Sequence, residues 1–246
     1  MDQFMHAEFW VAVGQIIMID ILLGGDNAVV IALACRQLPP NLRTKGIVWG
    51  TAGAIVLRVI LIFFALTLLS VPYLKIVGAL LLVWIGVKLI APDDEGGHGD
   101  IQASDRLWAA VKTVIVADLV MSVDNVIAIA GAAESAGGDH KMPLVIFGLL
   151  VSIPIIVWGS QLVIKLMARY PIIIPAGGML LGWIAGTMAV TDPATLPFMP
   201  TTPAAKPGAL PEVLDNVRYA AGVVGAVLVL IIALVIKRRR VQAAAG

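Results

Sequence analysis

Long apolar segments constrain this chain more than any other feature of its sequence. An α-helix needs about 20 apolar residues to cross the hydrocarbon core of a bilayer. The sequence predicts such helices over residues 9–34, 46–70, 72–91, 107–132, 143–168, 172–191 and 217–236. We therefore expect an all-α membrane protein with seven transmembrane helices, organised as a single transmembrane domain over residues 1–246.

The composition supports a membrane protein and excludes several other classes. Hydrophobic residues make up 60% of the chain, charged residues only 13%, and the mean hydropathy is +0.97. A single cysteine, Cys35, excludes an intramolecular disulfide and a cysteine-rich metal site. Because no nucleotide-binding motif is present, an ATP-driven pump on this chain is disfavoured. We expect neither a prosthetic group nor a nucleic-acid partner.

The distribution of Lys and Arg predicts the orientation in the membrane. Cytoplasmic loops are enriched in these residues. They follow the first, fifth and seventh predicted spans, at Arg36, Arg43, Lys45, Lys165, Arg169 and Lys237-Arg238-Arg239-Arg240. This predicts an outside N-terminus and a cytoplasmic C-terminus. The proline-rich segment 192–216 is then an outer loop, which we expect to be extended and weakly structured.

An internal repeat relates two of the predicted helices. DILLGGDNAVVIA begins at Asp20 and DLVMSVDNVIAIA begins at Asp118, and five of the thirteen positions are identical. A weaker match relates residues 79–86 to 178–185. The repeats then cover about 8–91 and 107–191, and three spans in each would invert one copy relative to the other. Secondary transporters often follow this plan, with the binding site at the repeat interface.

The repeated motif carries polar side chains suited to a cation. Asp20, Gly24 and Asn27 share one helix face, and so do Asp118, Ser122 and Asn125. The candidate metal ligands are Asp20, Asp26, Asn27, Asp118, Asp124 and Asn125, with Gly24, Ser122, Met121 and Arg58 as accessory candidates. Carboxylate and amide oxygens suit Mg²⁺, Ca²⁺ or Mn²⁺. Met121 adds a soft sulfur, although core packing is its simpler interpretation.

Intramembrane carboxylates need compensation, because each costs on the order of 2.5–3.5 kcal/mol on insertion scales. A bound divalent cation or protons would offset this cost, which suggests proton antiport. The alternative is that these polar groups only join helices by hydrogen bonds. Arg58, in the middle of the second span, also needs a partner. It either pairs with a site aspartate as an internal counter-ion or serves packing.

The paired motifs GGDNAVVIALA and SVDNVIAIAG resemble those of the TerC family of bacterial membrane proteins, named for tellurite resistance, over roughly residues 8–190. The resemblance implies a seven-helix inner-membrane protein related to LysE-type exporters. It also implies a role in divalent-metal transport, because several members are associated with manganese efflux and some with supplying metal to exported enzymes. The direction of transport rests on this resemblance alone. By position, the six candidate ligands are the family's motif residues.

Three functions therefore remain open. The first is a secondary transporter that exports Mn²⁺, with Ca²⁺ or a broader set of divalent cations as the alternative. The second is an intramembrane aspartyl protease, which needs only two carboxylates sharing a proton. The third is a scaffold in a tellurite- or stress-resistance complex. The expected partners are the cation and the lipid bilayer, and a homodimer is one conceivable assembly.

Overall fold

The computed structural model describes residues 14, 18, 26–92, 103–135, 141–203 and 211–245. The contacts divide the chain into two compact units. Unit 1 comprises Met1–Thr67 and Ile101–Leu166, and unit 2 comprises Leu68–Asp100 and Met167–Gly246. Each unit thus takes segments from both predicted repeats.

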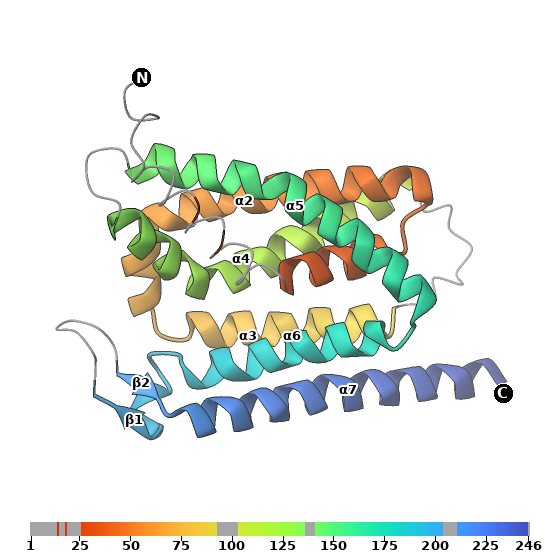
Figure 1. Ribbon diagram of the computed structural model, residues 1–246. Coiled ribbons are helices and arrows are strands. Elements are labelled where there is room, and N and C mark those ends of the chain that lie inside the picture. The colour runs from red at the N-terminus through yellow and green to blue at the C-terminus, as the bar shows by residue number, and fades with distance from the viewer. Residues whose placement is uncertain are drawn as a thin grey trace. The chain divides into compact units, whose positions relative to one another are not determined.

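The described part of unit 1 contains four helical segments. They are the helix Asp26–Cys35, α2 (Pro40–Ser70), α4 (Ala103–Ser135) and α5 (Lys141–Arg169), of which α2 and α5 end within unit 2 (Figure 1). Two glycines of α2 allow α4 to approach closely. A Cβ atom on Gly50 would lie 2.9 Å from Cγ1 of Val114, and one on Gly53 would lie 2.6 Å from Cδ1 of Ile115. This packing brings the middle of α2 against the middle of α4, where both helices carry polar residues.

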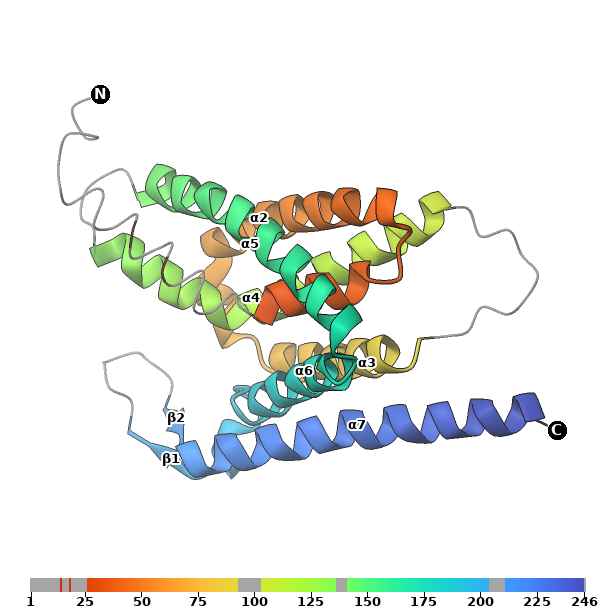
Figure 2. The same ribbon diagram turned by 45° about the vertical axis from the view of Figure 1, so that its right-hand side comes forward.

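Unit 2 is built from three helices that lie side by side. They are α3 (Leu74–Ile90), α6 (Ile173–Val190) and α7 (Asp215–Ala245), and α6 runs opposite to the other two (Figures 1 and 2). Leu82 and Leu181 are fully buried, as is Val229 of α7. The outward faces of these helices expose large apolar side chains such as Leu80 and Val224. Exposed apolar faces of this kind suit contact with lipid.

Small residues set the spacing between α6 and α7. A Cβ atom on Gly182 would overlap the carbonyl oxygen of Gly225, and one on Gly186 would overlap that of Ala221. A Cβ on Gly222 would lie 2.6 Å from the indole ring of Trp183. The two backbones are therefore as close as glycine permits, which is a common way to pack helices in membranes.

From the second predicted span to the seventh, the described helices agree with the prediction except near their ends, and of the first predicted span only the part from Asp26 onward is described continuously. The described chain is mostly helical, which confirms the expected fold class at that level. α2 begins at Pro40 rather than at residue 46, because proline fits the first turn of a helix. α3 begins at Leu74 rather than at Pro72, and α7 continues through the basic segment to Ala245. Within the described residues, three stretches are long and apolar enough to span a bilayer: Pro40–Leu61, Ile173–Val190 and Asp215–Gln242. Seven spans and an inverted repeat remain predictions.

The expectation of a weakly structured outer loop is wrong for the described part of residues 192–216. A short 3-10 helix, η2 (Leu196–Phe198), is followed by β1 (Thr201–Thr202). β1 pairs antiparallel with β2 (Glu212–Val213), with Thr201 opposite Val213. The prolines of this segment restrict the backbone rather than loosen it, because each fixes one dihedral angle.

Candidate metal-binding site

The described motif residues of both repeats lie in unit 1. Asp26 and Asn27 are the first two described residues of the helical segment Asp26–Cys35, whereas Asp118 and Ser122 lie in the middle of α4. Arg58 reaches them from α2. The side chains of Asn27, Arg58, Asp118 and Ser122 are all buried. Polar groups so deep in an apolar protein must satisfy one another or bind something else.

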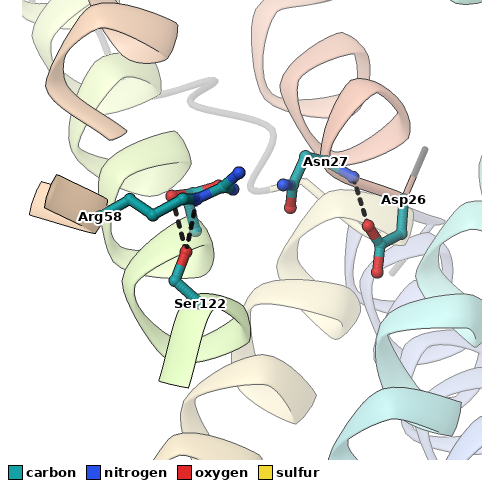
Figure 3. A network of polar contacts seen from close by, with 5 residues as sticks. Asp26, Asn27, Arg58 and Ser122 are labelled. Atoms are coloured by element: carbon teal, nitrogen blue, oxygen red, sulfur yellow. Dashed lines mark hydrogen bonds and ion pairs between the residues drawn. The ribbon is translucent and has the colours of Figure 1, made fainter. Parts of the chain in front are cut away.

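A closed network joins Arg58, Asp118 and Ser122 (Figure 3). Arg58 Nη2 donates a hydrogen bond to Asp118 Oδ1 at 2.6 Å, within an ion pair whose side chains are only 3% and 7% exposed. Arg58 Nε donates to Ser122 Oγ at 3.1 Å, and Ser122 Oγ donates to Asp118 Oδ2 at 3.1 Å. Asp118 and Ser122 thus share one face of α4, as predicted, whereas the side chain of Asn125, the third predicted member of this face, lies outside the described residues. Of the two roles considered for Arg58, pairing with a site aspartate is the one observed.

Asn27 faces this network from the neighbouring helix. Its side chain points toward the guanidinium of Arg58 in Figure 3. The residue is 4% exposed, and neither its amide oxygen nor its amide nitrogen has a hydrogen-bond partner within the described chain. A buried amide without partners costs free energy, on the order of 1–3 kcal/mol. Within the described contacts, the amide of Asn27 is thus available to bind a ligand.

Asp26 lies beside the network rather than within it. Its Oδ1 accepts a hydrogen bond of 2.8 Å from the backbone nitrogen of Asn27, and in Figure 3 the residue lies on the far side of Asn27 from Arg58. It still interacts electrostatically with both Asp118 and Arg58. The structure thus brings Asp26 and Asn27 near Asp118 and Ser122. Each of these four side chains offers an oxygen atom.

The structure describes only some of the remaining predicted site residues. Asp20 and Gly24 lie outside the described residues, as do the side chains of Asp124 and Asn125. Met121 is buried on α4, which suits its interpretation as core packing. In the described ranges, no group of three or more His, Cys, Asp or Glu side chains is close enough to hold a metal ion. The expected four-carboxylate cluster therefore stays a prediction.

Asp192 is a polar residue that sequence reasoning did not single out. It is fully buried at the end of α6. Its carboxylate accepts backbone hydrogen bonds from Tyr73, Lys75, Ile76 and Ala194, at 2.8, 3.0, 3.3 and 2.7 Å. The only local signal is the Asp192-Pro193 pair directly after an apolar helix. Which N–H groups it would bind was not visible in the sequence.

The described chain is mostly helical, has apolar outer faces and contains a buried charged network. These features define an α-helical integral membrane protein. The sequence matches the Integral membrane protein TerC family over residues 5–241, and the chain belongs to that family. The earlier resemblance is thereby confirmed over nearly the whole chain.

The relatives are also membrane proteins. "Uncharacterized membrane protein YjbE" of Bacillus subtilis is 40% identical over 195 residues, which cover 79% of this chain and 86% of that protein. "Uncharacterized membrane protein YceF" of the same organism is 28% identical over 188 residues, covering 73% and 71%. "UPF0053 inner membrane protein YoaE" of Escherichia coli is 22% identical over 194 residues, covering 71% of this chain but 36% of that protein. No solved structure matches the chain.

Proposed function

We propose that this chain is a secondary transporter that exports a divalent metal cation, with Mn²⁺ as the most favoured substrate. The observation that carries the proposal is Asn27, whose buried amide has no partner within the described chain and faces the guanidinium of Arg58, which is itself bound to Asp118 and Ser122. An unpartnered amide beside a buried carboxylate and a hydroxyl is a set of oxygen donors suited to a hard cation. Family membership adds the membrane setting.

The finer parts of the proposal concern the second copy and the coupling. Asp124 and Asn125 would complete the site from α4, and Asp20 would complete it from the first helix. Protons are the proposed coupling ion, because carboxylates that lose a cation in an apolar site are stabilised by protonation. Ca²⁺ is the alternative substrate, since it accepts the same oxygen ligands. The cytoplasmic C-terminus and export direction belong to this proposal too.

The observed pairing favours transport over an aspartyl protease. A protease dyad requires two carboxylates that share one proton. Asp118 instead directs one oxygen to Arg58 and the other to Ser122. No described contact favours the scaffold function, which we do not propose.

Metal flux into proteoliposomes tests the proposal. The wild type is compared with Asp26→Asn and Asp124→Asn for Mn²⁺, Ca²⁺, Mg²⁺ and Zn²⁺, with and without an imposed pH gradient. We expect Mn²⁺ flux in the wild type and its loss in both variants. Asp215→Asn is the matched control, because the side chain of Asp215 is 76% exposed. Wild-type flux no greater than in protein-free liposomes for all four cations would refute the proposal.

A further inference from the structure

The guanidinium of Arg58 occupies the oxygen atoms that a cation would need. Arginine stays protonated in proteins, and a buried charge requires a partner of opposite sign. Both carboxylate oxygens of Asp118 are engaged, Oδ1 by Arg58 and Oδ2 by Ser122. A divalent cation that binds Asp118 must therefore compete with the guanidinium, which lies 2.6 Å from Oδ1. The positive charge of Arg58 would also repel a divalent cation bound next to it.

The pairing is specific to arginine in its geometry. One guanidinium reaches two acceptors, Asp118 through Nη2 and Ser122 through Nε. A lysine ammonium is a compact point charge and does not offer this planar fork. The side chain also extends toward Asn27 (Figure 3), so it lies between the two motif segments. Arg58 therefore places a positive charge within the proposed site.

We propose that Arg58 is an internal counter-ion that competes with the transported cation for Asp118. This inference rests on the proposed function and adds a residue that sets the affinity of the site. When the cation leaves, the guanidinium takes over Asp118, so the buried carboxylate never remains without compensation. When the cation binds, the guanidinium releases Asp118. Arg58 therefore weakens cation binding and favours release, which an exporter requires.

The size of the effect follows from the population of the competent state. The apparent Kd equals the intrinsic Kd divided by the fraction of molecules in which Asp118 is accessible. If Arg58 holds Asp118 in nine of ten molecules, its removal lowers the Kd roughly tenfold. Tighter binding then slows release, so the maximal flux falls although the affinity rises. A merely structural arginine would give neither change.

The test measures Mn²⁺ binding by calorimetry to the purified full chain in nanodiscs, together with Mn²⁺ flux in proteoliposomes. For Arg58→Gln we expect a Kd roughly tenfold lower than in the wild type, with a reduced flux at saturating Mn²⁺. Arg58→Gln should also have a lower Tm without Mn²⁺ and a larger rise in Tm when Mn²⁺ is added. Arg58→Lys keeps the charge without the fork, so its Kd should lie between those of Arg58→Gln and the wild type.

Two further variants separate the possible failures. The double variant Arg58→Gln/Asp118→Asn removes both charges and should lose the gain in affinity, because Asp118 is the proposed ligand. If Arg58→Gln does not fold, Arg58→Lys and the double variant carry the comparison. A wild type that binds and transports Mn²⁺, with an unchanged Kd in Arg58→Gln or Arg58→Lys, overturns the counter-ion alone. A wild type and variants that all fail to bind Mn²⁺ overturn the Mn²⁺ transporter and the counter-ion together.

Discussion

Asp192 Oδ1 lies 2.8 Å from the backbone nitrogen of Tyr73, so the carboxylate that follows α6 holds the turn that begins α3. Asp192 Oδ2 accepts the N–H groups of Lys75 and Ile76, at 3.0 and 3.3 Å. These groups belong to the first turn of α3, where no intrahelical acceptor exists. Tyr73 has a φ of 67°, a left-handed conformation that is unfavourable for a residue with a side chain. The contact to Asp192 therefore stabilises a turn that the local sequence does not favour.

Removal of this carboxylate should destabilise unit 2. Asp192→Ala leaves several partly buried N–H groups without their acceptor, so we expect the free energy of unfolding to fall by an amount on the order of 3 kcal/mol. Asp192→Asn keeps one acceptor oxygen, so its free energy of unfolding should fall by roughly half as much. The measurement is the Tm of the purified protein in detergent. Asp215→Ala is the control, since its side chain is 76% exposed and pairs only with an exposed arginine. Equal Tm values for Asp192→Ala and the control would contradict the capping role.

Asn27 should separate stability from function. Neither of its amide atoms has a described partner, so Asn27→Leu removes two unsatisfied buried groups. We expect the Tm to stay the same or rise, because the free energy of unfolding should increase by up to about 1–2 kcal/mol. Mn²⁺ flux should nevertheless be lost, because the proposed ligand is gone. A lower Tm together with normal flux would show that Asn27 serves the fold and not the cation.

Asp118 and Asp26 should differ in what they contribute to folding. Asp118→Ala removes the carboxylate from the buried guanidinium of Arg58, and breaking a buried ion pair from one side costs about 3–5 kcal/mol. Asp26 accepts only a hydrogen bond from the adjacent backbone within the described contacts, so Asp26→Ala should cost about 1 kcal/mol. Both variants should lose Mn²⁺ flux. The Tm of each variant, measured beside its flux, checks this difference, and similar losses of Tm would count against it.

The glycines between α6 and α7 should not tolerate a methyl group. Gly182→Ala and Gly186→Ala each place a Cβ against a carbonyl oxygen of α7. Overpacking of this kind costs about 1–3 kcal/mol. Gly159→Ala is the matched control, because the nearest atom to its Cβ would be Ala28 Cβ at 3.9 Å. We expect a lower Tm for the first two variants only. A Tm unchanged in all three would mean that the helices can separate at little cost.

Cysteine labelling in intact cells checks the predicted orientation. The single native cysteine, Cys35, is fully buried and should not react with a membrane-impermeant maleimide. Phe198 and Val241 are exposed. Phe198 ends η2 shortly before β1, whereas Val241 is close to the C-terminal end of α7, and Figure 1 shows β1 and this end of α7 on opposite sides of unit 2. Phe198→Cys should be labelled from outside and Val241→Cys only after permeabilisation. The reverse pattern would invert the orientation and, with it, the proposed export direction.

The sequence by itself determined the membrane class and the approximate positions of the described helices, and it predicted a set of candidate site residues. Apolar length and helical period are local properties, so the spans could be placed to within several residues. Local spacing also put Asp118 and Ser122 on one face of α4, and their hydrogen bond spans four residues. The motif copies identified Asp26 and Asn27 as candidates because carboxylates and amides are rare within apolar runs.

Only the tertiary structure decided which partners these polar groups have. Arg58 and Asp118 are 60 positions apart, and Asp192 and Tyr73 are 119 positions apart. Such pairs depend on which faces of which helices meet, and that depends on close contacts such as Gly50 against Val114. The helical period predicts which residues share one face of a helix, but not which helix packs against that face. The need of Arg58 for a partner was therefore readable from the sequence, whereas the choice of Asp118 was not.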